Sequence, residues 1–282
     1  MSSTKTRAKS EVICPIKDVN LKASFMDLGF LVFQKKTLPF IEQLERVCSK
    51  FVVNKEQTFQ YSMMEHTFEK NRSLHKELNQ ILQPLYNQLF ENYSTYNGSL
   101  LVKPGLYGSE MNLHQDWTFT DEKEFSPCTI WIPLQDTNEQ NGCLFFIPKS
   151  HHFFDNFRSH HYETARISKA YFLEVNNLTV EKGDLVIFHP ALFHGSFSNE
   201  TSTPRIAISM TIMDKSAPFI HVKKNSETTA NIFRLHSDCF FKDLAELSVN
   251  YAFESPDCSI IPYRHHIPSF SEIKEKMKSH VY

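Results

Sequence analysis

The sequence predicts a mainly β fold, a β-sandwich or jelly roll with helices packed on one outer face. Apolar residues recur at three- and four-residue steps in the first third of the chain. After Gly98, short β-like runs alternate with turn residues at roughly even spacing. Helices followed by many short strands are typical of this class. No low-complexity linker divides the 282 residues, so we expect one domain.

The first third of the chain is predicted to supply helical support. Residues 1–20 are polar and are expected to form a mobile tail, with the single domain covering 21–282. The short apolar run 29–33 is predicted as the first ordered element, a strand. Amphipathic helices are expected from residue 38 to 51 and from 73 to 93, which together make a helical region at 38–93. Pro84 is predicted to kink or split the second helix.

The β-rich core is expected at about residues 98–213. Turn residues separate its apolar runs, and Asn141-Gly142 provides a hairpin signal between two of them. The predicted strands are the runs 100–102, 129–134, 143–147, 184–188 and 205–213. Residues 214–282 carry no chemical motif and are expected to form a C-terminal cap or extension. We leave open whether this part covers a pocket, packs on the core or forms a dimer contact.

The predicted strand 205–213 alternates in character with each residue. One face is apolar, and the other face is small and polar and begins with an arginine. The apolar face suits packing under the helices, whereas the polar face suits the wall of a cavity for a polar ligand. The two faces comprise Ile206, Ile208, Met210 and Ile212 on one side, and Arg205, Ala207, Ser209 and Thr211 on the other.

Composition and charge restrict the class of partner. The net charge is -2, so the sequence offers no electrostatic reason to expect nucleic acid or an anionic membrane, and we expect a small-molecule partner. The six cysteines are scattered without a CxxC pair, which argues against a thiolate zinc site or a disulfide framework. Reduced thiols and the lack of a secretory-type apolar segment favour a cytoplasmic location. The oligomeric state is not predicted.

A histidine and a carboxylate two residues apart form the first candidate metal site. In an extended segment, His114 and Asp116 project to the same side and can bind one ion. Two histidines and one carboxylate, with the remaining positions open, are the ligand set of non-haem Fe(II) oxygenases. His194 is the predicted third ligand, because ten residues separate it from Arg205, which opens the alternating strand. His189 is the competing histidine, but Pro190 follows it directly, so we interpret it as a turn residue.

Several further motifs occur in a fixed order and resemble the phytanoyl-CoA dioxygenase family. They extend from about residue 100 to 213 and comprise His114-Gln-Asp116, Trp131-Ile-Pro-Leu134, Asn141-Gly142-Cys-Leu, Ile147-Pro-Lys-Ser-His151, His194-Gly-Ser196 and Pro204-Arg205. The resemblance implies a double-stranded β-helix, that is, a cupin-like jelly roll. It also implies mononuclear Fe(II), O2 and 2-oxoglutarate, which is decarboxylated to succinate and CO2. Lys149 departs from the family's usual glycine before Ser-His, on a turn outside the ligand set.

The resemblance also implies roles for individual residues. His114, Asp116 and His194 would hold the iron, and Arg205 would bind the distal carboxylate of 2-oxoglutarate bidentately, through two guanidinium nitrogens. Ser196 and, as a weaker candidate, Thr129 would help to bind the same carboxylate. The presence of Asp116 argues for hydroxylation, or another oxidation by hydrogen abstraction, over halogenation, since related halogenases have Gly or Ala there.

Alternative interpretations remain open at this point. The chain could be a non-enzymatic jelly-roll binding protein that kept the triad residues, or a cupin-type oxygenase that needs no 2-oxo acid, although Arg205 argues against the latter. The segment 151–166 could be a lid or a plain surface loop. Trp131 could wall the cosubstrate pocket or simply pack in the core. The paired histidines are not expected to be ligands; they are His151-His152, His160-His161 and His265-His266.

Overall fold

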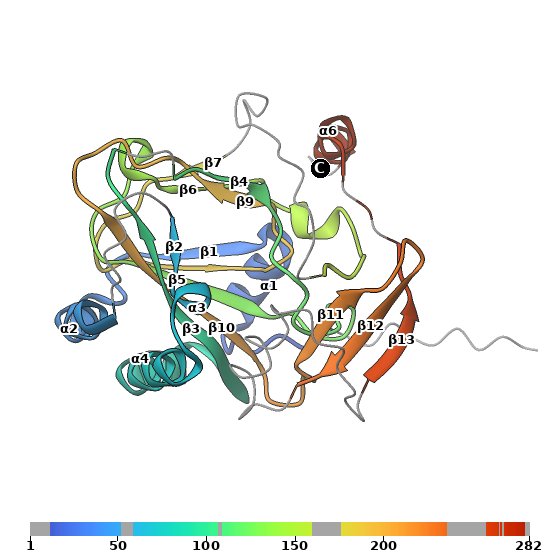
Figure 1. Cartoon of the computed structure of the whole chain (residues 1–282), viewed down its shortest axis with the longest axis horizontal. Helices are drawn as coiled ribbons and strands as arrows, with labels where there is room; N and C mark the ends of the chain where they lie inside the picture. Colours follow the sequence, from blue (N-terminus) through green and yellow to red (C-terminus); the bar gives the residue numbers. More distant parts are fainter. Residues whose placement is uncertain are drawn as a thin grey trace, which may run out of the picture.

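Two antiparallel β-sheets face each other and form the centre of the molecule (Figure 1). The computed structural model describes residues 12–51, 59–106, 109–159, 176–235, 258–264, 266 and 268–279. Within these residues the larger sheet has six strands and the smaller sheet four, and the two do not join into a closed barrel. The prediction of a mainly β jelly roll with flanking helices is therefore confirmed.

The larger sheet supplies the long strands. Its order is β1-β8-β5-β10-β3-β2, with neighbouring strands antiparallel. The register between β10 and β3 shifts between Ser209 and Thr211, which marks a β-bulge. The strands are β1 (Phe30–Phe33), β2 (Gln60–Tyr61), β3 (Tyr93–Lys103), β5 (Cys128–Pro133), β8 (Leu185–Phe188) and β10 (Arg205–Asp214).

The smaller sheet is built from short strands in the order β4-β9-β6-β7. They are β4 (Met111–His114), β6 (Leu144–Phe146), β7 (Asn176–Leu178) and β9 (His194–Ser196). Asn141 and Gly142 lie at the end of the 3-10 helix η2 (Glu139–Asn141), with Gly142 in the left-handed conformation. The expected turn signal thus lies just before β6.

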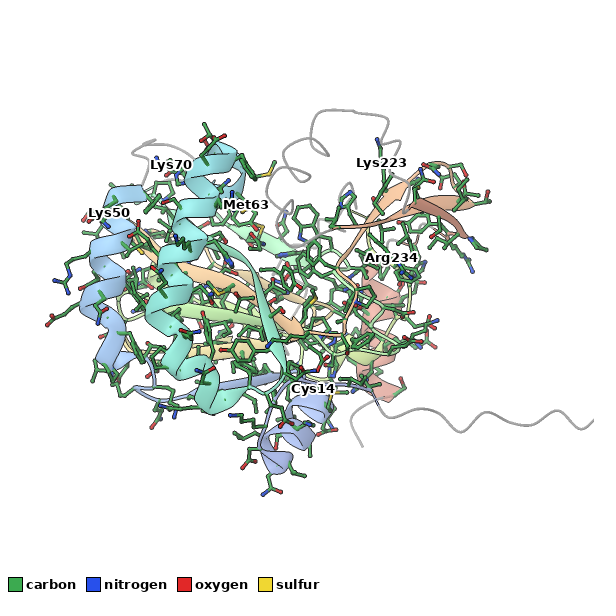
Figure 2. The ribbon with its side chains drawn as sticks, turned by 90° about the horizontal axis from the view of Figure 1, so that it is seen from below. Cys14, Lys50, Met63, Lys70, Lys223 and Arg234 are labelled. Carbon is green, nitrogen blue, oxygen red and sulfur yellow. The ribbon has the colours of Figure 1, made fainter. Side chains whose placement is uncertain are left out.

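Helices cover the outer face of the larger sheet. Figure 2 shows α2 (Ile41–Phe51) and α4 (Phe68–Leu89) lying side by side across it. Leu44, Leu82 and Met210 are among the fully buried residues of the core between helices and sheet. Because Ile208 and Ile212 belong to the same core, the prediction for the apolar face of 205–213 is confirmed.

The N-terminal prediction is wrong for residues 12–20. Cys14 and Ile16 are buried, and Ile16 pairs with Phe90, because this segment crosses the end of the core before α1 (Val19–Leu28). Asp18 caps α1 by accepting hydrogen bonds from two backbone amides, and Gly29 ends it at φ 84°. The first ordered element is thus a helix and not the strand β1. Residues 1–11 lie outside the described residues.

The second predicted helix is shifted and unbroken. It forms α4 from Phe68 to Leu89 and continues through Pro84, so the alternative of a split is wrong. The strand that follows begins at Tyr93 rather than after Gly98. Thr67 explains the earlier start, because its side chain accepts a hydrogen bond from the backbone amide of Lys70. A short helix, α3 (Ser62–Glu65), precedes α4.

The C-terminal region packs beside the two sheets. A three-stranded meander is formed by β11 (Ile220–Lys224), β12 (Thr229–Arg234) and β13 (Cys258–Pro262). Ile273 of α6 (Phe270–Ser279) is fully buried in a cluster with Leu113 and Phe145 of the smaller sheet. Of the described residues in the predicted extension 214–282, none lines the main cavity, so this part packs on the core. Within the described residues, no helix combines the length and apolar character needed to cross a bilayer.

Candidate active site

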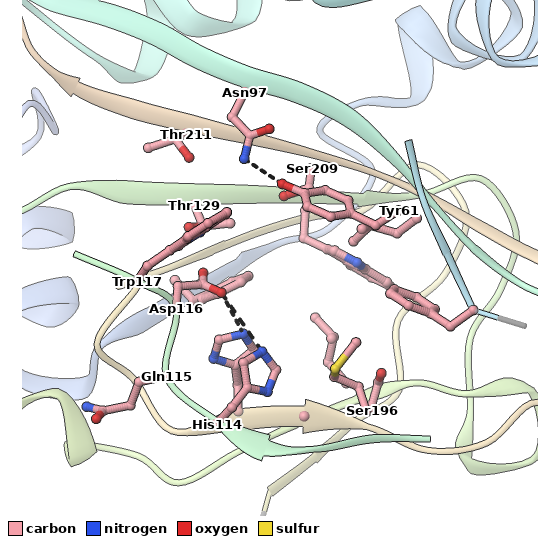
Figure 3. Close-up of a pocket in the computed structure, with 18 of the residues that line it drawn as sticks. Tyr61, Asn97, His114, Gln115, Asp116, Trp117, Thr129, Ser196, Ser209 and Thr211 are labelled. Atoms are coloured by element: carbon pink, nitrogen blue, oxygen red, sulfur yellow. Dashed lines mark hydrogen bonds and ion pairs between the residues drawn. The ribbon is translucent and has the colours of Figure 1, made fainter. Parts of the chain in front are cut away.

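A cavity of about 320 Å³ lies between the two sheets. Its walls come from both sheets and from the segment around β2, and Figure 3 shows the predicted metal ligands on one side of it. Aromatic side chains form much of the lining, together with amide and hydroxyl groups. The lining includes Phe59, Tyr61, Asn97, Trp117, Phe119, Thr129, Trp131, Phe188, Ser196, Arg205, Ser209 and Thr211.

The predicted triad comes together at one end of this cavity. His114 at the end of β4 pairs across the strands with His194 at the start of β9, which brings the two imidazoles side by side. Asp116 follows two residues after His114, and its Oδ1 lies 3.9 Å from Nε2 of His114 and 3.6 Å from Nε2 of His194. All three ligand atoms lie within 4.8 Å of one another. In the described part of the chain, this is the one group of three such side chains close enough to share an ion.

The backbone determines which nitrogen of each histidine faces the cavity. Nδ1 of His114 donates to the carbonyl of Asn112 at 2.7 Å, and Nδ1 of His194 donates to that of Leu192 at 2.8 Å. With Nδ1 protonated, each Nε2 presents a lone pair toward Asp116. Burial lowers the pKa of both histidines to about 4, so both are neutral at pH 7, while burial raises the pKa of Asp116. Two neutral imidazoles and one carboxylate thus converge on one point.

The loop that carries Asp116 is held from three sides. Its backbone amide donates to the carbonyl of Pro190 at 2.8 Å, and the neighbouring Gln115 donates through Nε2 to Ala191 at 2.6 Å. Arg158 donates through Nε to the carbonyl of Asp116 at 2.5 Å. The other end of the Arg158 guanidinium binds Glu122 at 2.8 and 2.6 Å. Sequence reasoning missed Arg158, since nothing in its local spacing distinguishes it from a surface arginine.

Arg205 occupies another part of the cavity, at the start of β10. It is only 2% exposed, and its guanidinium carbon lies 5.5 Å from the ring centroid of Trp131. Its Nε and Nη1 atoms have no hydrogen-bond partner among the described residues. Burial lowers its pKa to about 10, so it remains positively charged at pH 7. A buried guanidinium without a partner is suited to binding an anion.

The neighbouring Lys103 does not compete with Arg205 for an anion. Lys103 pairs with Arg205 in the β3–β10 register and is fully buried. Its Nζ donates to backbone carbonyls, including that of Phe197 at 2.5 Å, and so is satisfied without an anion. Burial and the nearby Arg205 lower the pKa of Lys103 to about 6. Of Lys103 and Arg205, only Arg205 has hydrogen-bond donors that no described residue uses.

The two weaker predicted residues occupy different parts of the cavity. Ser196 is on β9 beside the Lys103 ammonium, which places it toward the Arg205 end. Thr129 instead pairs with Thr211, six positions along β10 from Arg205, or roughly 20 Å of strand. Figure 3 shows it beside Asp116, at the triad end of the cavity. The structure therefore does not bring Thr129 to the predicted carboxylate site.

The remaining predictions concern histidines and a lid. His189 is buried, and its Nδ1 accepts a hydrogen bond from Ala191 instead of facing the triad. His151 and His152 both direct Nε2 at the carbonyl of Met26. His160, His161, His265 and the segment 160–166 of the predicted lid lie outside the described residues. Ser159, just before that segment, lines the cavity.

The comparisons with known proteins agree with this geometry. The family model described as phytanoyl-CoA dioxygenase matches residues 30–207, which is more than half of the chain. Phytanoyl-CoA dioxygenase 1 of Oryza sativa subsp. japonica is 36% identical over 123 residues, which cover 41% of this chain and 42% of the relative. The peroxisomal phytanoyl-CoA dioxygenase of Bos taurus is 28% identical over 221 residues, which cover 71% of this chain and 60% of the relative. The matches thus span about half the length of these relatives.

Among solved structures, the epimerase SnoN in complex with Fe3+, alpha ketoglutarate and nogalamycin RO has a similar fold. The TM-score is 0.50 at 16% sequence identity, and the match covers 71% of this chain and 84% of that chain. At this identity the likeness shows the fold alone. The family match, supported by the fold and by the His-Asp-His arrangement, establishes the assignment. The chain belongs to the phytanoyl-CoA dioxygenase family.

Proposed function

We propose that this protein is an Fe(II)- and 2-oxoglutarate-dependent dioxygenase. It oxidises a small molecule by hydrogen abstraction, with hydroxylation as the favoured outcome, and releases succinate and CO2. One observation carries the proposal: a triad of two neutral imidazoles and a carboxylate shares a cavity with a buried guanidinium that lacks an anion. The triad suits a divalent metal, and the guanidinium suits the far end of a dicarboxylate.

The residues present fit the implied metal. His114 and His194 offer Nε2 lone pairs and Asp116 offers a carboxylate oxygen, which is the ligand set favoured by non-haem iron. The side chains of His114 and Asp116 are 17% and 24% exposed, so the side of the triad that faces the cavity remains accessible. When bound, the iron supplies the reaction with O2 that the protein's own side chains cannot perform.

The chain's own residues then bind and orient the cosubstrate. Arg205 holds a carboxylate through its unpartnered nitrogens, and Trp131, stacked against the same guanidinium, walls this part of the pocket. Ser196 adds a hydroxyl on the side of the smaller sheet. The aromatic lining limits the water that can approach the reacting groups. Arg158 keeps Asp116 in place through its backbone carbonyl.

The reaction type is the finer part of the proposal. Asp116 occupies the metal position that must lack a carboxylate for halide to bind, which favours hydroxylation over halogenation. The name of SnoN, an epimerase, shows that another outcome occurs on this fold. The product therefore has to be identified: hydroxylation adds the mass of one oxygen atom to the substrate, whereas epimerisation leaves the mass unchanged.

The test begins without a substrate. Anaerobic addition of Fe(II) and 2-oxoglutarate to the purified protein should give the weak visible absorption band of the keto-acid chelate. Screening small molecules for stimulated succinate formation then identifies the substrate. If calorimetry finds no coupled uptake of metal and 2-oxoglutarate, the protein is a binding module that kept the triad residues.

We also propose a cytoplasmic location. The support is limited to the scattered cysteines, of which those in the described residues are free thiols. The mammalian relative is named as peroxisomal, so the compartment needs its own test. Imaging of the tagged chain against cytosolic and peroxisomal markers decides between the two.

A further inference from the structure

The wall of the cavity formed by β3 and β2 carries a hydrogen-bonding pair that the proposed reaction does not use. Asn97 of β3 donates through Nδ2 to the phenol oxygen of Tyr61 at 2.7 Å. Both residues line the cavity, and Figure 3 shows the pair across it from His114 and Asp116. Asn97 is 6% exposed, and its Oδ1 has no partner among the described residues.

A β-bulge in β3 places Asn97 at this position. Between Ser209 and Thr211 of β10, β3 contains one residue more than its partner strand, and Asn97 lies in this bulge at φ 55°. Asparagine tolerates this left-handed conformation better than most residues, and bulges near active sites re-aim side chains. Helix α4 supports the bulge, because Nδ1 of His75 accepts a hydrogen bond from the amide of Gly98 at 3.0 Å.

Tyr61 completes the pair as a neutral group. Burial raises its pKa to about 12, so the phenol keeps its proton at neutral pH. Its oxygen accepts from Asn97, and its O–H, which also lies within reach of the Ser99 hydroxyl, can turn to donate to a ligand. The pair therefore combines a phenol donor with an unpartnered amide acceptor. A hydroxyl group, which both donates and accepts, matches this combination.

The cosubstrate does not account for the pair. Asn97 lies opposite the stretch of β10 four to six residues from Arg205, or roughly 13–20 Å along the strand. Tyr61 is level with Ala207, two residues from Arg205, but it lies on β2, which β3 separates from β10. A short dicarboxylate held by Arg205 would lie between that residue and the triad, away from Asn97. Apart from the triad itself and Arg205, none of the described lining residues is a Lys, Arg, His, Asp or Glu. This side of the cavity thus suits an uncharged molecule.

The geometry points to Asn97 and Tyr61 as the specificity-determining pair that binds a hydroxyl group of an uncharged substrate. This inference rests on the proposed function, because it takes the triad as the reacting centre. Asn97 contacts the substrate, and Tyr61 both contacts it and orients the amide. An unmatched buried amide oxygen is costly, so a substrate lacking the hydroxyl should bind about tenfold more weakly.

The test uses matched pairs of small probes on the Zn(II)- and 2-oxoglutarate-loaded protein. Benzyl alcohol is compared with benzyl fluoride, and cyclohexanol with fluorocyclohexane, since fluorine is similar in size to a hydroxyl but cannot donate. Dissociation constants are measured by ligand-observed NMR. The wild type should prefer the alcohols about tenfold, and Asn97→Gly, which keeps the positive φ but removes the amide, should lose this preference. Tyr61→Phe should reduce it.

Asn92→Gly is the matched control. Asn92 also has a positive φ, 44°, but its amide binds Asp214, and it does not line the cavity. This control should retain the preference for alcohols. An equal affinity for alcohols and fluorides in the wild type, or an unchanged preference in Asn97→Gly, would overturn the inference. The anaerobic Fe(II) and 2-oxoglutarate band, recorded for each variant, separates the two proposals: its presence upholds the proposed function whatever the probes show, and its absence from the wild type overturns both.

Discussion

The described part of the chain contains two groups of close histidines, and only one of them lies with a carboxylate in an arrangement that could hold a metal. The rings of His114 and His194 are 4.2 Å apart, and those of His151 and His152 are 3.8 Å apart, with His189 5.3 Å from His151. Ring spacing therefore does not distinguish them. We call the first pair the metal-facing histidines and the second group the stacked histidines.

The two groups differ in which ring nitrogen forms a hydrogen bond with a backbone carbonyl. The metal-facing histidines donate through Nδ1 to carbonyls two residues earlier, which leaves Nε2 free beside Asp116. The stacked His151 and His152 both turn Nε2 to the carbonyl of Met26. Their ligand atoms do not converge with a carboxylate, whereas those of the triad do. The arrangement that could hold a metal thus depends on local backbone acceptors more than on the number of nearby histidines.

Removing a triad ligand should have the largest effect on turnover and Fe(II) binding. If it had none, the proposed difference between the two groups of histidines would be wrong. We expect Asp116→Ala, His114→Ala and His194→Ala each to abolish turnover and to weaken Fe(II) binding by more than about 100-fold, which is the upper range for losing an outer-shell partner. His189→Asn, in the stacked group, is the control and should bind Fe(II) as the wild type does. Calorimetric Fe(II) titration measures both. Near-normal turnover in any triad variant would remove that residue from the metal site.

The second prediction concerns the anion end of the same cavity. Arg205→Ala should weaken 2-oxoglutarate binding by about 30- to 1000-fold, equivalent to about 2 to 4 kcal/mol for a lost charge-assisted bidentate contact. Fe(II) affinity should stay nearly unchanged, because Arg205 does not contact the triad. Arg205→Lys should remain impaired, since an ammonium cannot reproduce the two-point contact. Normal 2-oxoglutarate binding with a lowered Tm would show instead that Arg205 is purely structural.

The third prediction concerns Arg158 and asks whether the residue that holds the Asp116 loop also affects Fe(II) binding. Arg158→Met removes the hydrogen bond to the carbonyl of Asp116 and leaves Glu122 without its partner. We expect about 10- to 100-fold weaker Fe(II) binding, together with a lower Tm. Lys123→Met is the control, because it removes only an exposed ion pair with Asp155. A loss of Tm with unchanged Fe(II) affinity would limit Arg158 to a structural role.

The smallest expected effect is on the pH dependence of stability through the stacked histidines. Burial lowers the pKa of His189 to about 3, so between pH 6.5 and 3 the unfolded chain binds a proton that the folded chain does not. Stability at pH 7.5 is unaffected by this group and falls as the pH decreases below 6.5, by about 2 kcal/mol at pH 5.

His189→Asn should reduce this loss, because its amide oxygen can accept the hydrogen bond of Ala191 without titrating. Urea unfolding of the metal-free protein at pH 7.5 and pH 5 measures the free energy of unfolding of both forms. Identical pH dependence in wild type and variant would show that His189 is protonated in the folded protein.

Local patterns in the sequence predicted the parts of the site that depend on strand periodicity. The two-residue spacing of His114 and Asp116 places both on one side of an extended segment, and the alternation after Arg205 separates a core face from a cavity face. Both are properties of adjacent residues, so no tertiary information was needed. The same reasoning failed for residues 12–20, where burial of Cys14 and Ile16 comes from contacts with distant segments.

Residue type and spacing in the sequence thus predicted the class of fold, which the structure confirms, and the candidate triad and arginine, whose roles stay predictions. Only the tertiary structure decided three further features: the cross-strand pairing of His114 with His194, the placement of Thr129 far from Arg205, and the bulge that turns Asn97 toward Tyr61. Each of these depends on the register between strands that are distant in the chain. Register is set by packing of whole sheets, and a local pattern does not encode it.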